Sequence, residues 1–293
     1  MTLDQLLMLT TVIDLGNVQA ASQKLNKTQP AISKGLKQLE TQLQINILDR
    51  SEYRLKLTPE GKQVYSHAKR ILAETDILQQ VTTHLSQGNE SEVSIAIDGA
   101  FDSAQLTPIF AKIQNKFPHT SLIIRQEYLT GAFNRLINDE VDIAISLKES
   151  ALIKRQPLDY LYLNVQSLIT VANPNILRRH TNLTSVEQLK SEYLIMLQDS
   201  GSLTKGFEFG VLDGQRKYYV NDFATKKQLI VNDVGWGKLP EYMMQTELDN
   251  GNLVIITPEG NENRIDIEYY AIKKKILGPI GTYLWQTLAK SFG

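Results

Sequence analysis

The segment Ala20–Ser33 constrains the fold of this chain more than any other stretch, because it predicts two short helices joined by a tight turn. The first helix is expected to end at Leu25, and the next two residues form the turn. Thr28 then takes the N-cap position of the second helix, where its hydroxyl accepts a hydrogen bond from a free amide of the first turn. Pro30 fits inside that turn because it has no N–H group to lose.

The second predicted helix has an apolar face and a polar, basic face. Apolar residues recur at helical spacing, so this face is expected to pack inward: Ile32, Leu36, Leu39 and Leu43. The opposite face is typical of a recognition helix in the major groove of DNA. We expect it to contact DNA through Thr28, Gln29, Pro30, Ser33, Lys34 and Lys37. Because a plain helical hairpin with a polar outer face shows the same pattern, the flanking sequence has to decide.

The flanking sequence predicts a β-wing. A short apolar run precedes the charged, turn-like stretch Asp49–Lys56, which carries Arg50 and Arg54. Thr58 then opens another helix as its N-cap, with a proline at the first helical position. Helix, turn, helix, basic wing and long helix together predict a winged helix-turn-helix over residues 1–58. The two wing arginines are expected to meet DNA phosphates.

These motifs resemble those of the LysR-type transcriptional regulators. The matching residues span about sixty positions: Leu3–Leu6, Ala20, Ala21, Leu25, Thr28–Ser33, Leu36, Leu39, Glu40, Leu43, Arg50, Leu57, Thr58 and Gly61. Asn17 and Gln44 depart from the family pattern, which usually has serine and glycine at these turns. The resemblance implies a sequence-specific DNA-binding regulator. Its implied partners are a double-stranded operator, a small-molecule effector, further copies of the chain in a homodimer or dimer of dimers, and RNA polymerase.

Charge is distributed unevenly along the chain. Residues 1–70 hold ten basic and six acidic residues, which leaves this segment about four positive. Because the whole chain has a net charge of −1, the remainder is about five negative. A basic head on an acidic body fits neutralisation of DNA phosphates by one end only.

Several other classes of protein are disfavoured by the sequence. The chain has no cysteine, which excludes disulfides, thiol redox sensing and cysteine-ligated zinc. Its four histidines show no metal-ligand spacing, and no serine lies in a Gly-x-Ser-x-Gly turn. We therefore expect no metal, no cofactor and no enzymatic activity. The N-terminus lacks a signal-peptide pattern and no apolar run approaches membrane length, so we expect a cytoplasmic protein without a membrane partner.

Residues 59–90 predict a long linker helix followed by a hinge. Apolar or small residues recur in alternating steps of four and three, as in a coiled-coil seam: Val64, Ala68, Ile71, Thr75, Leu78, Thr82 and Leu85. We expect this helix to pair with that of a second copy, which would place two winged helices about one DNA turn apart. The alternative is that the same face packs on the chain's own C-terminal domain. Gly88–Ser91 ends the helix and is expected to be the hinge.

Residues 91–293 alternate between strands and helices, which predicts parallel α/β architecture. The predicted elements of the second half include a strand over Gln166–Ala172 and helices over Ser202–Phe209 and Ala224–Val231. Trp236 is expected either to wall the cleft or to pack in the core. We expect two α/β lobes joined by crossing strands, similar to a periplasmic binding protein. Lobe I comprises residues of about 91–164 and 265–293, and lobe II those of about 165–264. Two segments resemble landmarks of LysR effector domains, Asp142–Ile145 and Gly235–Pro240.

A cleft between such lobes, at the carboxyl ends of strands, binds small molecules. By resemblance, the effector contacts map to Gly99, Ala100, Phe101, Ser103, Thr130, Ser200, Ser202 and Phe223. Free amides at the predicted helix starts near Ser103 and Ser202 favour an anion. Gly99 and Ala100, however, stand where many relatives place hydroxyls that hold a ligand carboxylate, so the charge of the effector is left open. Each predicted hydroxyl contact has an alternative role as a helix cap or turn residue.

The competing hypothesis is a solute-binding or catalytic α/β protein with an incidental helical N-terminus. Neither class needs the helix start at Thr28 or the basic wing, and a secreted binding protein would carry a signal peptide. The sequence therefore favours transcriptional regulation.

Overall fold

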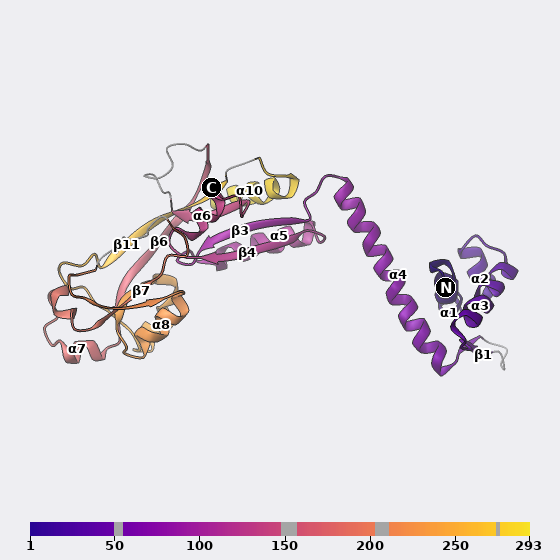
Figure 1. Cartoon of the computed structure of the whole chain (residues 1–293), viewed down its shortest axis with the longest axis horizontal. Coiled ribbons are helices and arrows are strands. Elements are labelled where there is room, and N and C mark those ends of the chain that lie inside the picture. Colours follow the sequence, from indigo (N-terminus) through magenta and orange to yellow (C-terminus); the bar gives the residue numbers. More distant parts are fainter. Residues whose placement is uncertain (50–54, 148–156, 203–210, 274–275) are drawn as a thin grey trace. The chain divides into compact units, whose positions relative to one another are not determined.

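The computed structural model describes residues 1–49, 55–147, 157–202, 211–273 and 276–293. The chain divides into two compact units, Met1–Gln87 and Gly88–Gly293. Figure 1 shows the helical character of the first unit and the extended sheet of the second. Within the described ranges, no helix combines the length and the apolarity needed to cross a membrane.

The first unit is a helical domain with a small β-ribbon. Its elements are α1 (Leu3–Leu15), α2 (Val18–Lys24), α3 (Gln29–Leu43), β1 (Leu48–Asp49), β2 (Lys56–Leu57) and α4 (Pro59–Ser86). Thr2, Asn17, Thr28 and Thr58 cap the four helices through their side chains. The predicted inward residues Ile32, Leu36 and Leu39 are buried in a core shared by α1, α3 and α4. The helix-turn-helix prediction is confirmed: the first helix ends at its C-cap Leu25, and the second begins after its N-cap Thr28.

A small set of polar contacts fixes the ribbon and the start of α4. Glu40 accepts hydrogen bonds from the backbone N–H groups of Ile47 and Leu48, at 2.9 and 3.0 Å. The Thr58 hydroxyl donates to the Asn46 carbonyl at 2.6 Å and accepts from the Gly61 N–H at 2.8 Å. A side chain at position 61 would collide with the Ile47 carbonyl, which is why glycine is needed there.

Helix α4 packs on its own domain over its first half. Val64 and Leu72 pack against the N-terminal core, and Ala68 is only 1% exposed. Val64 and Ala68 therefore belong to packing within one chain, contrary to the predicted seam. Further along, Ile71, Leu78 and Leu85 are 39%, 60% and 45% exposed, so a seven-residue repeat of apolar side chains is left uncovered within this unit.

The second unit is built on one continuous sheet. The described strands are β3 (Glu92–Asp98), β4 (Ser121–Glu127), β5 (Ile143–Leu147), β6 (Asp159–Ala172), β7 (Tyr193–Leu197), β8 (Arg216–Val220), β9 (Trp236–Pro240), β10 (Val254–Ile255) and β11 (Arg264–Lys273). Among these residues the order is β4-β3-β5-β11-β6-β9-β7-β8, with β10 paired to β6. The β3–β4, β3–β5 and β7–β8 pairs are parallel, as the alternation predicts.

Helices cover both faces of this sheet, as expected for an α/β fold. They are α5 (Thr107–Lys116), α6 (Gly131–Ile137), α7 (Asn175–Arg179), α8 (Phe223–Val231), α9 (Gln245–Asp249) and α10 (Pro279–Phe292), with 3₁₀ turns η1 (Ser103–Leu106), η2 (Val186–Leu189) and η3 (Glu241–Met243). Buried side chains of α5 and α10 share one core cluster, whereas those of α6 lie in another. Helix α7 was not predicted. The helix predicted over 202–209 lies almost wholly outside the described residues.

Two long antiparallel strands connect the lobes. β6 and β11 pair from Asp159–Lys273 to Ile169–Arg264, with a register shift at Tyr269/Tyr270. β11 also pairs with β5 of lobe I, and β6 also pairs with β9 of lobe II. Strand β6 is twice as long as predicted. Its unpredicted first half, Asp159–Val165, contains the apolar and aromatic run Tyr160–Leu163, of which Leu163 is buried.

Two residues of the predicted hinge, Gly88–Ser91, are bonded to the second unit. Glu90 accepts hydrogen bonds from the Ile280 and Gly281 N–H groups at the start of α10, both at 3.0 Å. The Ser91 carbonyl accepts from the Ser121 N–H at 2.9 Å. Glu90 and Ser91 are thus anchored in the second unit. Helix α4 ends at Ser86 with Gln87 as its C-cap, and Gly88 follows with a φ of +78°.

Candidate functional site

The exposed face of α3 carries the residues expected to contact DNA. Thr28, Gln29, Pro30, Ser33, Lys34 and Lys37 are all exposed. Thr28 also caps the helix, through a 3.4 Å hydrogen bond from the Ala31 N–H. Within the described part of the chain, Lys34 and Lys37 form no ion pair, whereas Lys27 pairs with Asp4 at 3.2 Å. The two lysines are therefore available to phosphates.

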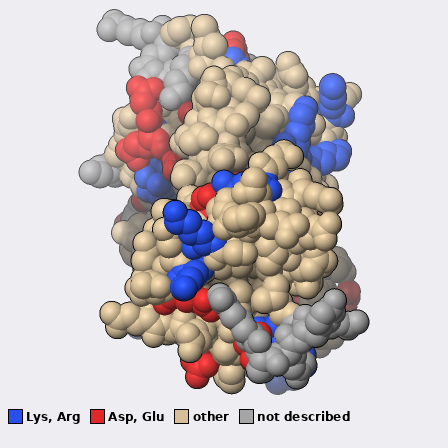
Figure 2. All heavy atoms as spheres, turned by 90° about the vertical axis from the view of Figure 1, so that its right-hand side faces the viewer, with Lys and Arg blue, Asp and Glu red and all other residues tan. Residues whose placement is uncertain are grey.

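Strands β1 and β2 pair antiparallel, as expected for the base of a wing. Arg50 and Arg54, the predicted phosphate contacts of the wing, lie outside the described residues. Figure 2 shows one face of the molecule, with Lys and Arg side chains at the surface among Asp, Glu and uncharged residues. The exposed α3 face and the β-ribbon together have the composition of a DNA-binding surface.

In the second unit, the predicted hydroxyl contacts connect the two lobes. Asp199, after β7, accepts hydrogen bonds from the N–H and the hydroxyl of Thr130 in lobe I, at 3.0 and 2.7 Å. The Ser200 hydroxyl accepts from the Tyr128 N–H at 2.8 Å. The Ser202 hydroxyl accepts from the Asn134 side chain at 3.1 Å. We name these contacts, between residues 128–134 and 199–202, the interlobe clasp.

The other predicted effector contacts in lobe I do not share one site. Some are buried in the core, and Ser103 lies on the surface. Ala100 and Phe101 are 4% and 1% exposed, and the Phe101 ring packs edge-on against Tyr269. The Gly99 carbonyl accepts a hydrogen bond from the Tyr242 hydroxyl at 3.1 Å. Ser103 is exposed and begins a 3₁₀ turn in which Asp102 accepts from the Ala104 N–H. The expected free amides near Ser103 are thus occupied in part by a carboxylate, which disfavours an anion there.

Asp98, at the end of β3, is a buried carboxyl group beside this segment. It accepts hydrogen bonds from the Tyr269 hydroxyl and the Ala100 N–H, both at 2.8 Å. Burial raises its pKa to about 6, and the charge of Asp199 adds to the increase. Its hydrogen bonds hold the end of β3 against β11 in the core.

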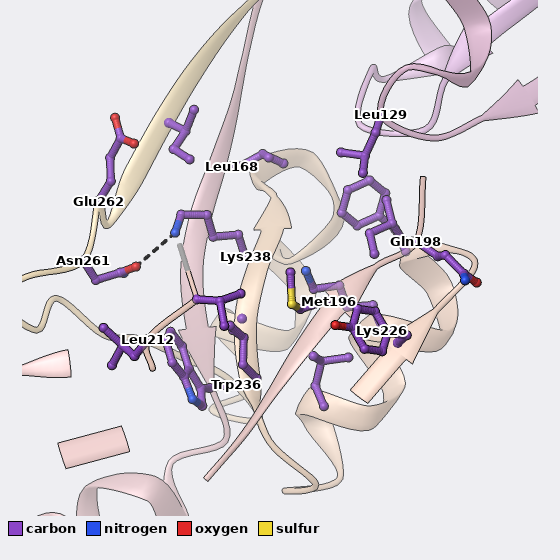
Figure 3. A pocket seen from close by; sticks show the side chains of 18 of the residues that line it. Leu129, Leu168, Met196, Gln198, Leu212, Lys226, Trp236, Lys238, Asn261 and Glu262 are labelled. Carbon is purple, nitrogen blue, oxygen red and sulfur yellow. Dashed lines mark hydrogen bonds between the residues drawn. The ribbon is translucent and has the colours of Figure 1, made fainter. Parts of the chain in front are cut away.

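A cavity of about 710 Å³ lies mainly in lobe II, and Leu129 and Asp199 of the clasp segments are part of its lining. This volume falls in the range of small-molecule sites. Figure 3 shows its side chains, which come from β7, α8, β9 and the crossing strands. Most of its wall is apolar: Leu129, Leu168, Val186, Leu194, Ile195, Met196, Leu197, Val211, Leu212, Phe223, Trp236, Ile265 and Ile267. Phe223 lines this cavity, and none of the other seven predicted effector contacts does.

Two lysines supply positive charge to this apolar cavity. Lys226 of α8 is only 6% exposed, and burial, followed by the nearby charge of Lys238, lowers its pKa to about 7. Lys238 of β9 donates to Asn261 at 3.1 Å, drawn as a dashed line in Figure 3, and burial lowers its pKa as well. Asp199, Glu262 and Gln198 add polar groups to the wall.

Neither lysine was among the predicted site residues, although the sequence contains a signal for Lys226. Phe223, Lys226 and Ile230 recur at steps of three and four, and all three are buried in the structure. A lysine on the inward face of a short helix is a buried charge, and buried charges are rare in proteins unless they bind an opposite charge. Trp236, expected either to wall the cleft or to pack in the core, is 1% exposed and lines the cavity.

Comparison with known protein families decides the class. A model of the bacterial regulatory helix-turn-helix proteins of the lysR family matches residues 3–62. A model of the LysR substrate binding domain matches residues 86–276. The chain belongs to the LysR family. This LysR-family protein is a DNA-binding transcriptional regulator with an effector-binding domain, and its family is one of regulators rather than enzymes.

Relatives match this regulator along its whole length. It is 26% identical to the probable HTH-type transcriptional regulator YhaJ of Escherichia coli (strain K12), over 100% of this chain and 97% of that protein. It is also 26% identical to CrgA of Neisseria meningitidis serogroup B, over 92% of this chain and 91% of that protein. The fold is similar to that of full-length LysG of Corynebacterium glutamicum with bound effector Arg, with a TM-score of 0.54, 19% identity and coverage of 99% and 98%.

Proposed function

We propose that this regulator binds its operator as a homodimer, and that a small molecule in the lobe II cavity changes its affinity for that operator. The observation that carries the proposal is the cavity itself, which combines an apolar wall with two inward lysines. Leu129 and Asp199 line the cavity and also belong to the clasp segments. An occupant would therefore touch the groups that hold the lobes together, and its differential affinity for open and closed lobes would shift their populations.

The proposal of a dimer is supported by the uncovered stripe on α4. Ile71, Leu78 and Leu85 repeat every seven residues and are exposed within their own unit. An isolated helix with such a stripe gains stability by pairing with a second one. Pairing would also present two copies of α3 to adjacent half-sites of a palindromic operator. A dimer of dimers and contact with RNA polymerase are further parts of the proposal, supported by the family alone.

The DNA-binding part of the proposal predicts two different kinds of mutant. An operator is first selected from random double-stranded DNA with the full chain, and affinities are then measured by fluorescence anisotropy at several salt concentrations. We expect Gln29→Ala to lower the preference for operator over random DNA about tenfold, because a base-edge contact is lost. We expect Lys37→Ala to weaken binding to both DNAs and to reduce the salt slope by about 1, because a phosphate contact is lost.

The matched control is Gln42→Ala, an exposed glutamine near the other end of α3. It is expected to bind both DNAs as the parent chain does. Equal loss in all three variants would mean that α3 is being destabilised rather than stripped of contacts. Unchanged preference in Gln29→Ala would contradict the assignment of base contacts to the start of α3.

A further inference from the structure

Lys226 is a buried amino group with no acidic partner among the residues that the structure describes. Its side chain is 6% exposed and lines the cavity. Among the described residues its Nζ atom forms no hydrogen bond and no ion pair, and its nearest aromatic contact is Phe223, with Nζ 5.9 Å from the ring centroid. A buried ammonium group without a partner is strongly disfavoured, so such a group points to a ligand or to a function.

The backbone around Lys226 leaves room for its side chain. A Cβ atom at Gly237 of β9 would lie 3.2 Å from Lys226 Cε and 3.5 Å from Nζ. The ammonium group therefore lies against bare backbone on the strand that also carries Lys238. Figure 3 shows both lysine side chains among the residues that line the cavity, together with Met196 and Trp236.

The acidic groups of the cavity are engaged elsewhere. The Asp199 carboxylate accepts three hydrogen bonds, from the N–H and hydroxyl of Thr130 and from the Gly201 N–H. Glu262 acts on Lys238, whose pKa it raises against the effect of burial. Burial and Lys238 lower the pKa of Lys226. Among the described residues of the cavity, none places a negative charge against Lys226 Nζ.

We infer that the cavity binds an apolar monocarboxylic acid, with its carboxylate on Lys226 Nζ and its hydrocarbon or aromatic body on the apolar wall. The inference rests on the proposed function, because it names the ligand class of the same cavity. One carboxylate fits better than a phosphate group, since the wall is mostly apolar and Lys238 is already bonded to Asn261. A carboxylate in contact with a buried ammonium forms a charge-assisted hydrogen bond, which is stronger than a neutral one.

Calorimetric titration of the full chain with decanoate and 4-phenylbutyrate, each beside its primary alcohol, tests the inference. We expect one site per chain, with the acids bound at least tenfold more tightly than the alcohols. Lys226→Met is expected to weaken acid binding by about 30-fold or more and to leave alcohol binding unchanged, because hydrogen bonds to charged groups are strong. Lys227→Met is the matched control, since Lys227 is the next residue and pairs with Glu247 at 3.5 Å.

Proton uptake gives a readout that general packing cannot imitate. A bound carboxylate favours the charged form of Lys226, so binding at pH 8 takes up close to one proton in the parent chain and none in Lys226→Met. Titration in buffers of different ionisation enthalpy measures this number. Lys238, Asp199, Glu262 and Tyr219 are the other ionisable groups facing the cavity, and all remain in the variant.

The outcomes separate this inference from the proposed function. Binding of alcohols as tight as that of acids, with a change in operator affinity, would overturn the choice of an acid and keep the cavity as the effector site. Acid binding that depends on Lys226 but leaves operator affinity unchanged would support the ligand class and overturn the proposed control of DNA binding. Acid binding that Lys226→Met does not weaken would overturn the inference.

Discussion

Lys226 lowers the stability of the folded chain when its cavity holds no anion. Its pKa is about 7 in the folded chain and near 10.5 when exposed, so the folded state binds fewer protons between these values. The cost is therefore fully present at and below pH 7 and disappears as the pH rises toward 10.5, and its size is about 3–5 kcal/mol. A residue that costs this much stability is typical of a binding site rather than of a scaffold.

Lys226→Met is accordingly expected to raise the free energy of unfolding of the ligand-free chain, most strongly at pH 7 and less at pH 9.5. Urea unfolding followed by tryptophan fluorescence measures the effect, since both tryptophans, Trp236 and Trp285, lie in the effector-binding unit. Lys227→Met, which loses an ion pair between two half-buried side chains, is expected to be destabilising. A destabilised Lys226→Met chain would show that Lys226 has a stabilising partner.

Asp98 affects the stability of the folded chain with a pH dependence opposite to that of Lys226. Its pKa is raised from 3.8 to about 6 on folding, so the folded chain holds a proton that the unfolded chain releases. Stability contributed by this proton is present below pH 4 and is lost as the pH rises through 6, at a cost of about 3 kcal/mol.

Asp98→Asn keeps an acceptor oxygen for Tyr269 and Ala100 but cannot ionise. We expect the variant to be more stable than the parent chain at pH 7.5 and equal to it near pH 4.5, in urea unfolding at both values. Asp102→Asn, at the cap of the neighbouring turn, controls for loss of a negative charge. A variant that loses stability equally at both pH values would mean that geometry, not ionisation, governs this position.

At the level of elements, local sequence determined the helix ends well and the long strands poorly. Thr28 and Thr58 cap α3 and α4 as predicted, because capping depends on a residue and its next three neighbours. The first half of β6 was not predicted, although it holds the apolar run Tyr160–Leu163. Its pairing with the distant strand β11 extends β6, and that pairing cannot be seen in the sequence of β6. The α8 helix was found, but Lys226 on its inward face was not recognised as a candidate site residue.

Local sequence was also insufficient for the predicted coiled-coil seam on α4, of which two residues pack within their own domain. The spacing of Val64 and Ala68 fits both a partner helix and the chain's own core, and only the packing of the domain distinguishes them. The uncovered part of the stripe predicts that Ile71→Asp with Leu78→Asp separates the proposed dimer, because it buries uncompensated charge between helices. Light scattering on the double variant measures the mass. The control, Ile71→Ala with Leu78→Ala, shortens the same side chains without introducing a charge. An unaltered mass in the aspartate variant would place the interface elsewhere.

Across the whole effector-binding unit, the clasp is the feature that sequence could not reveal. The predicted hydroxyls Thr130, Ser200 and Ser202 lie between the lobes, as expected, but they bond to protein groups from the opposite lobe. Their partners are more than sixty residues away in the chain, so no local pattern indicates the pairing. Because Asp199 and Leu129 also line the cavity, the clasp is the route by which we expect an occupant to affect the lobes.

Weakening the clasp is therefore expected to separate the lobes without damage to either core. Thr130→Val with Ser200→Ala removes a hydroxyl bond to the Asp199 carboxylate and a bond to the Tyr128 N–H, each worth about 1–3 kcal/mol. Because the chain has no cysteine, Lys112→Cys on α5 and Arg178→Cys on α7 provide two specific labelling positions, one on each lobe. Energy transfer between dyes, measured with an excess of unlabelled chain, is expected to show longer distances in the clasp variant.

Thr287→Val is the matched control for this measurement. Thr287 is also buried, but its hydroxyl bonds to the Tyr283 carbonyl within its own helix α10, away from the clasp. It is expected to keep the parent distance. Lengthening in the clasp variant alone would mean that these side chains hold the lobes together, so that a ligand acting on Asp199 or Leu129 can change the lobe equilibrium by about the same 1–3 kcal/mol that couples sites in regulated proteins. Equal distances in all three chains would mean that the crossing strands β6 and β11 alone fix the lobes, and the cavity would then need another route to the DNA-binding unit.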